Sequence, residues 1–156
     1  TLLEKHENLI ILRSFSKLYA LAGLRIGFAL CGTKVKEILR YQNYYLGGSR
    51  ILEEVAISAL ESGDYYKNLS EEIIKDRENF ITEVNKLKNF KAFNSKANFV
   101  LVKVDESVKK LLEQELDNMD FSISKFVFEN SMRVSIGSKQ HTDKFLEVLT
   151  KIDENI

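Results

Sequence analysis

The sequence predicts an α/β chain in two parts, with short strands and helices near the amino end and a small α+β unit at the carboxyl end. The apolar runs near the amino end have the length and the polar flanks of strands. Residues 65–87 instead repeat apolar side chains at helical spacing, and after Asn89 the period becomes that of strands. We therefore expect a first region over 1–64, a linking helix over 65–89 and a small α+β domain over 90–156.

The composition limits the classes of partner. The 156 residues suffice for one domain with a real core or for slightly more. Lys and Arg together number 23, as do Asp and Glu, so no net charge attracts nucleic acid or an anionic membrane. No segment approaches the roughly 18 uninterrupted apolar residues of a membrane span. The single cysteine, Cys31, excludes a disulfide framework and favours a cytoplasmic setting.

The first region predicts two strands and two helices. Leu9–Leu12 is a short apolar run that suits a buried strand, and Ile26–Cys31 suits a second one. A helix is expected from Thr33, as its N-cap, to Leu39. A turn rich in tyrosine and glycine follows over Tyr41–Ser49. The second helix is expected over Ile51–Leu60.

Beyond that helix, Gly63 is its expected C′ residue, at which the helix stops. The carboxyl-terminal region then alternates strands and helices. Strand patterns cover Phe99–Val104, Phe121–Phe128 and Met132–Gly137, and helical stripes run over 108–119 and from Thr142 to Ile152. Helices packed on a small sheet make a compact unit, and we expect the apolar stripes to form its core.

Anion-binding groups are concentrated in one stretch, Asn8–Leu30. It contains the hydroxyls of Ser14 and Ser16 and the cations Lys17 and Arg25. A Ser-x-Ser-Lys sequence after a strand is most often a solvated turn. The Ala-Gly-Leu-Arg sequence that ends at Arg25 makes the combination longer and more specific, and this favours an anion site over a simple turn.

The runs SFSK at 14–17 and LAGLRIGF at 21–28 resemble the lysine segment of class I and II pyridoxal-phosphate aminotransferases, and among these the histidinol-phosphate aminotransferases. The resemblance implies the end of a fold-type-I large domain over 1–64, followed by the small domain. It implies pyridoxal 5′-phosphate as cofactor, with Lys17 as the catalytic residue that bonds to it. Ser14, Ser16 and Arg25 then match the groups that bind the cofactor phosphate.

The chemistry accounts for each of these residue types. Only a primary amine can form an imine, exchange it for a substrate amine and then act as a base, so the catalytic position requires lysine. Arginine suits a phosphate because its planar fork stays charged and donates in pairs. Serine hydroxyls add short local donors.

The segment Met132–Gly137 carries a second candidate. Strand alternation puts Met132 and Val134 on one face and Arg133 on the other. On geometry alone Arg133 is a surface arginine of a sheet. The segment also resembles the one whose arginine binds the substrate α-carboxylate in the same family, which implies a substrate-binding role for Arg133. Asn98 lies in a family-like segment without an assigned role.

The resemblance implies an aminotransferase of amino-acid biosynthesis that acts on histidinol phosphate with 2-oxoglutarate. Its partners are then an amino acid or amino phosphate and a 2-oxo acid, and the full-length enzyme is a homodimer. A decarboxylase of a phosphorylated amino acid, of the threonine-phosphate type, is the alternative, although that group tends to have proline where Ala22 stands. The third possibility is a folded module with no activity of its own.

Two further expectations concern completeness and metals. Thr1–Glu7 begins in a helical pattern without an initiator methionine, and the aspartate and tyrosine that the family places before the lysine are absent. We therefore expect a carboxyl-terminal portion that is inactive alone. His6 and His141 have no neighbours at metal-ligand spacing, so we expect no metal site.

Overall fold

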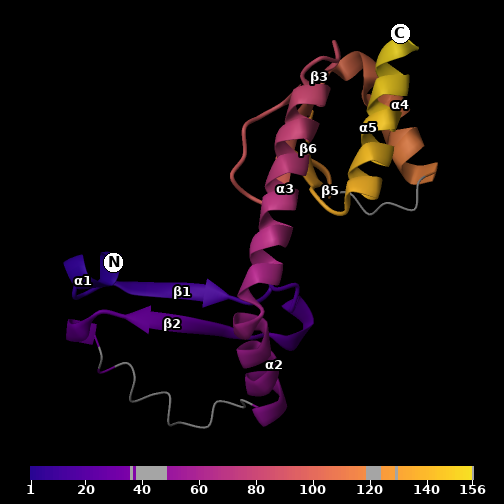
Figure 1. Cartoon of the computed structure of the whole chain (residues 1–156). Coiled ribbons are helices and arrows are strands. Elements are labelled where there is room, and N and C mark those ends of the chain that lie inside the picture. Colours follow the sequence, from indigo (N-terminus) through magenta and orange to yellow (C-terminus); the bar gives the residue numbers. More distant parts are fainter. Residues whose placement is uncertain (36, 38–48, 119–123, 129, 156) are drawn as a thin grey trace. The chain divides into compact units, whose positions relative to one another are not determined.

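The computed structural model describes residues 1–35, 37, 49–118, 124–128 and 130–155. Its contacts divide the chain into two compact units, Thr1–Asn68 and Leu69–Ile156 (Figure 1). Each unit has a hydrophobic cluster of its own. The assignment of regions to a large-domain tail, a linking helix and a small domain stays a prediction about the whole protein.

The first unit begins with α1 (Leu2–Lys5) and an antiparallel pair of strands, β1 (Ile10–Ser14) and β2 (Gly27–Cys31). Both predicted strands are therefore present. The first was expected to be buried in the whole domain and to be an exposed edge in this portion, and in this chain Leu12 is 77% exposed. The physical reason is that β1 pairs with β2 alone in a two-stranded sheet, and no other described strand extends that sheet.

The core of the first unit lies where the β1–β2 connection meets a helix. The connection contains the short 3-10 helix η1 (Ala22–Leu24), and the helix is α2 (Arg50–Glu61). Phe15, which is 2% exposed, forms a buried cluster with two small residues of α2, Ala56 and Ala59. Half-buried aromatic and aliphatic side chains surround this cluster, namely Tyr19, Leu21, Ile26, Phe28 and Tyr66.

The junction between α2 and α3 (Gly63–Val84) differs from the predicted one. Gly63 was expected to end the first helix as its C′ residue, but it begins α3 and does not have a left-handed φ. The end of α2 is satisfied by Ser62 instead. The N–H and the hydroxyl of Ser62 both donate to the Ser58 carbonyl, at 3.1 and 2.9 Å, so no glycine conformation is required.

The second unit contains a four-stranded antiparallel sheet in the order β3-β4-β6-β5. The strands are β3 (Phe90–Ala92), β4 (Phe99–Val104), β5 (Ser124–Phe128) and β6 (Ser131–Ser135). The sequence predicted the last three. It missed β3, whose three residues are too few to show a period of two.

Helices cover one face of this sheet. These are the carboxyl-terminal part of α3, together with α4 (Glu106–Asn118) and α5 (Lys139–Glu154), of which α4 and α5 lie side by side (Figure 1). The buried face of the sheet and these helices share one core, which includes Val100, Val102, Val104, Met132, Phe80, Val84, Val108, Leu112, Phe145 and Leu149. The predicted α+β core is therefore confirmed.

Some predicted elements fall partly outside the described residues. Only residues 33–35 and 37 of the helix expected from Thr33 to Leu39 are described, and they have 3-10 geometry. The turn expected over Tyr41–Ser49 lies outside except for Ser49, the N-cap of α2. The start of the strand expected from Phe121 also lies outside, and its described part begins at Ser124.

Candidate functional site

The predicted phosphate-binding residues lie at one end of the β1–β2 pair. Ser14 is the last residue of β1. The N–H of Phe15 donates to the Ile26 carbonyl at 3.2 Å, so the antiparallel pairing continues one step beyond the strands. Ser16 follows Phe15, and Arg25 precedes Ile26. Backbone pairing thus brings the segments that carry Ser14, Ser16 and Arg25 to the same end of the β1–β2 pair.

The loop that carries the lysine has an unusual backbone. Ala20 and Arg25 both have a φ of 54°, in the left-handed region that side chains other than glycine rarely adopt. The N–H of Ala20 donates to the Lys17 carbonyl, and the N–H of Leu21 donates to the Phe15 carbonyl, both at 3.0 Å. Residues in such conformations concentrate at ligand-binding sites, where the surrounding structure maintains them.

The donors of this site are available to an anion. The Ser14 Oγ accepts the Ser16 N–H at 3.0 Å, and its own hydroxyl proton stays available to donate. Lys17 is exposed and Arg25 donates only to the Ala22 carbonyl, at 3.3 Å, among the residues that the structure describes. Neither cation has a carboxylate partner in that part of the chain. Two hydroxyls and two cations, neither of which is ion-paired within the described residues, form a donor set that fits a phosphate dianion.

A neighbouring cavity of about 620 Å³ belongs to the same unit. Arg25 lines it together with apolar side chains of β2 and α2, among them Phe28 and Leu52, and with one carboxylate, that of Glu53. Ser14, Ser16 and Lys17 are not among its lining residues. Arg25 therefore belongs both to the donor cluster and to the lining of this cavity.

In the second unit, Arg133 lies where strand alternation predicts. Met132 and Val134 are buried, and Arg133 is exposed on the opposite face of β6. Its guanidinium carbon lies 5.3 Å from the centre of the Phe99 ring on the adjacent strand. Within the described residues no hydrogen bond or ion pair involves the Arg133 side chain. All of its N–H groups are consequently available to an anionic ligand.

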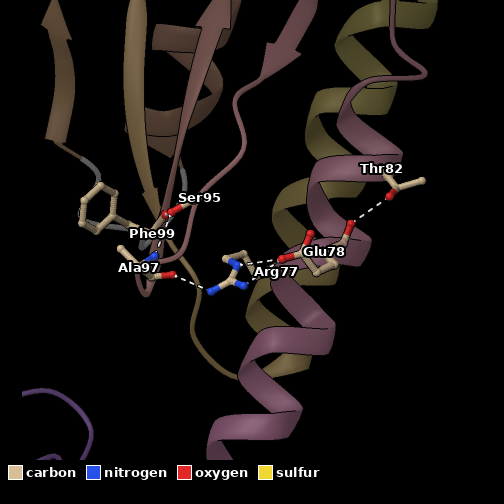
Figure 2. Close-up of polar contacts among 6 residues, drawn as sticks. All are labelled: Arg77, Glu78, Thr82, Ser95, Ala97 and Phe99. Carbon is tan, nitrogen blue, oxygen red and sulfur yellow. Dashed lines mark hydrogen bonds and ion pairs between the residues drawn. The ribbon is translucent and has the colours of Figure 1, made fainter. Parts of the chain in front are cut away.

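Sequence reasoning missed Arg77, which is buried with only 4% of its surface exposed. Its Nη1 donates to the Ala97 carbonyl at 3.1 Å, and its Nη2 pairs with the Glu78 carboxylate at 2.7 Å (Figure 2). The hydrogen bonding that the Glu78 carboxylate accepts from Arg77 holds the pKa of Glu78 below its ordinary value. A signal was present, because Arg77 lies at helical spacing between Ile73 and Phe80 on the apolar stripe of α3.

The comparison with protein families decides the assignment. A sequence model of the family described as "Aminotransferase class I and II" matches residues 1–149. The chain belongs to this family. Class I and II aminotransferases depend on pyridoxal phosphate, so the predicted family and cofactor class are both confirmed.

Curated relatives of this aminotransferase chain include histidinol-phosphate aminotransferase 2 of Archaeoglobus fulgidus. It is 36% identical over 150 residues, which are 94% of this chain and 43% of the relative. The histidinol-phosphate aminotransferase of Methanothermobacter thermautotrophicus is 32% identical over 158 residues, with 97% of this chain and 42% of the relative covered. The chain thus spans less than half the length of these relatives.

Solved structures confirm the fold-type-I architecture. The histidinol-phosphate aminotransferase of Clostridium acetobutylicum has a TM-score of 0.79 at 24% identity, over 99% of this chain and 48% of that one. The enzyme of Sinorhizobium meliloti, in complex with pyridoxal-5′-phosphate, has a TM-score of 0.74 at 24% identity, over 96% and 42%. The L-threonine-O-3-phosphate decarboxylase of Porphyromonas gingivalis has a TM-score of 0.75 at 18% identity, over 97% and 49%.

The described part of the chain contains neither a helix that could cross a membrane nor a metal-binding group of side chains. Its described helices include none with the length and apolar character that a membrane span requires. In the same part of the chain, no three His, Cys, Asp or Glu side chains are grouped in a way that could bind a metal ion.

Proposed function

We propose that the full-length protein is a pyridoxal-phosphate-dependent aminotransferase that exchanges an amino group between histidinol phosphate and 2-oxoglutarate. The observation that carries the proposal is the donor cluster of Ser14, Ser16, Lys17 and Arg25, in which neither cation is ion-paired within the described residues. The relatives of at least 30% identity described above, which are named histidinol-phosphate aminotransferases, support this choice of substrate.

The residues of this chain have distinct tasks in the proposed reaction. Bound pyridoxal phosphate supplies an electron sink that stabilises negative charge at the substrate Cα. The Lys17 Nζ is the primary amine that bonds to the cofactor and, once released, moves the Cα proton. Ser14, Ser16 and Arg25 bind the cofactor phosphate, which fixes the reacting atoms relative to Lys17. Orientation of this kind is worth roughly 7 to 11 kcal/mol of barrier.

Arg133 binds the anionic end of each substrate in this proposal. In 2-oxoglutarate that group is the α-carboxylate. Histidinol phosphate has no α-carboxylate and instead presents a phosphate ester. A guanidinium fork donates in pairs to either anion, so one arginine can serve both half-reactions. The exposed Arg133 side chain, which lies over the Phe99 ring and has no hydrogen bond or ion pair within the described residues, supports this role.

The decarboxylase alternative has weaker support. Its structural similarity, at 18% identity, is a similarity of fold alone. Ala22 also stands where decarboxylases of this type tend to have proline. The proposal includes a homodimeric, cytoplasmic enzyme, and the free thiol of Cys31 is compatible with a reducing compartment.

Reductive trapping tests the cofactor role of Lys17. The full-length protein is incubated with pyridoxal phosphate, reduced with borohydride and digested for peptide mapping. We expect the label on Lys17, and Lys17→Arg should abolish it. Lys34 is the internal comparison, because it is exposed in the same unit but pairs with Glu7 at 2.8 Å. A label on Lys34 and none on Lys17 would refute the assignment, and turnover of phosphothreonine but not of histidinol phosphate would favour the decarboxylase.

A further inference from the structure

We propose that Phe99 is a positioning residue for Arg133. Arg77 and Ser95 fix the turn that leads into Phe99, the first residue of β4. The inference rests on the proposed function, in which Arg133 binds the anionic end of the substrates. It adds a specific claim, namely that a short series of contacts from α3 to β6 sets the direction of the Arg133 guanidinium.

The first contact joins the two exposed side chains. Leu101 is the direct partner of Arg133 in the β4–β6 pairing, and Phe99 is the partner of Ser135. Phe99 and Arg133 are therefore diagonal neighbours on the same face, within reach of long side chains. A distance of 5.3 Å from the guanidinium carbon to the ring centre lies inside the range of a cation–π interaction. A ring restricts the arginine without occupying any of its N–H donors, which a carboxylate partner would do.

The second set of contacts fixes the backbone at Phe99. The Ser95 hydroxyl donates to the Phe99 carbonyl at 2.6 Å, and its oxygen accepts the Ala97 N–H at 3.1 Å. One side chain thus closes the turn that precedes β4 (Figure 2). The Asn98 carbonyl accepts the Ile136 N–H at 2.9 Å, which joins the turn to the end of β6. Hydrogen bonds therefore fix the backbone from which the ring of Phe99 projects, at the Phe99 carbonyl and at the preceding Asn98 carbonyl.

The third contact joins this turn to α3. Arg77 is buried on the apolar stripe of α3, and its Nη1 reaches the Ala97 carbonyl. Glu78 accepts from Nε and Nη2 of the same guanidinium, at 3.3 and 2.7 Å, so the Arg77 fork is fixed between helix and turn (Figure 2). Burying a guanidinium is costly unless it is paired and hydrogen-bonded. In this unit the pairing connects the long helix to the turn that carries Phe99.

The kinetic test compares two phenylalanines in the full-length enzyme. Phe99→Leu removes the ring below Arg133. Phe93→Leu is the matched control, because Phe93 is 40% exposed, compared with 37% for Phe99, and also lies below a cation, Lys91, at 5.8 Å. We expect Phe99→Leu to raise KM for both substrates about two- to fivefold, with kcat and cofactor affinity unchanged. Phe93→Leu should leave all four constants unchanged, and Phe99→Tyr should restore KM.

A spectroscopic test does not depend on enzymatic activity. In the NMR spectrum of residues 1–156, the Arg133 Nε–H resonance should carry a ring-current shift. The shift should disappear in Phe99→Leu, decrease in Ser95→Ala and in Arg77→Lys, and persist in Phe93→Leu. Arg77→Lys keeps the charge but loses the fork that reaches two partners. Ser95→Ala provides a second test of the turn if the Arg77 variant is unstable.

The outcomes separate this inference from the proposed function. If Arg133→Lys raises KM for both substrates while Phe99→Leu behaves like Phe93→Leu, the proposed function stands and the positioning role is refuted. If Arg133→Lys changes neither KM, the substrate-binding role of Arg133 and the positioning role of Phe99 both fail, while the cofactor role of Lys17 is decided by the trapping experiment. A resonance that is the same in wild type and Phe99→Leu would also refute the positioning role, whatever the kinetics.

Discussion

At Gly27 the backbone of the neighbouring strand leaves no room for a side chain. A Cβ added there would lie 2.8 Å from the Arg13 carbonyl oxygen, which is backbone and cannot swing aside. The pairing of Ser14 with Gly27 therefore requires glycine. Ser14 belongs both to this pair and to the donor cluster, so the spacing of the pair also bears on the position of Ser14.

We expect Gly27→Ala to destabilise the first unit by about 1 to 3 kcal/mol, because the strands must separate to accept the methyl group. Gly23→Ala is the control, since nothing lies within 4 Å of a Cβ at Gly23. The control should change stability by less than about 1 kcal/mol. Urea denaturation followed by circular dichroism measures both, and equal stability of the two variants would contradict the prediction.

Arg133 provides the second prediction at this scale. Arg133→Lys keeps the charge but loses the bidentate fork, so kcat/KM should fall by an amount that corresponds to about 2 to 5 kcal/mol for the 2-oxo acid and for histidinol phosphate alike. Cofactor affinity should not change. Lys103→Ala is the control, because Lys103 is an exposed cation of the neighbouring strand β4, on the same face of the sheet as Arg133. Steady-state kinetics of both half-reactions decide, and a loss confined to cofactor binding would assign Arg133 another role.

At the scale of elements, α5 is attached to the start of β3 by one side chain. The Asp153 carboxylate accepts hydrogen bonds from the N–H of Lys88 at 3.0 Å and from the N–H and Nδ2 of Asn89 at 2.8 and 2.9 Å. Partial burial acts to raise the pKa of Asp153, but these hydrogen bonds outweigh it and hold the pKa below its ordinary value. The ionised carboxylate is therefore the form that stabilises the fold.

This connection predicts a pH dependence of stability. Because the folded pKa of Asp153 is depressed, its contribution is complete above the ordinary aspartate pKa and is lost as pH falls through the folded value. We expect Asp153→Ala to cost about 1 to 3 kcal/mol at neutral pH and progressively less below pH ~4. Urea midpoints of wild type and variant at several pH values test this. A difference that grows on acidification would contradict it.

The elements also show what the sequence could predict. Periodicity correctly indicated α3, β4 and the helices of the second unit, because their buried faces repeat over several turns or strand pairs. It missed β3, which is too short to repeat, and it assigned a stop to Gly63 where the Ser62 hydroxyl makes one unnecessary. The hydrogen bond of Arg77 could not be predicted from the sequence, because its acceptor, the Ala97 carbonyl, is a backbone group that is distant in sequence.

For the whole molecule, this chain spans less than half the length of its relatives, and we expect this to limit its chemistry. Residues 1–156 with pyridoxal phosphate and histidinol phosphate should show no amino transfer above a Lys17→Ala control. The reason is that the resemblance implies an aspartate, outside this chain, that keeps the cofactor ring protonated. An absorbance assay of the cofactor measures this. Clear Lys17-dependent transfer by residues 1–156 would overturn the prediction.

The Asp153 connection has a genetic consequence as well. It joins positions 64 and 65 residues apart in sequence, and one of its two ends lies in the last turn of α5. A stop codon at position 153 would leave every candidate site residue in the translated product and would still remove the carboxylate that fastens α5 to β3. The codons for the last turn of α5 are therefore under a constraint that their distance from Lys17 in the sequence does not suggest.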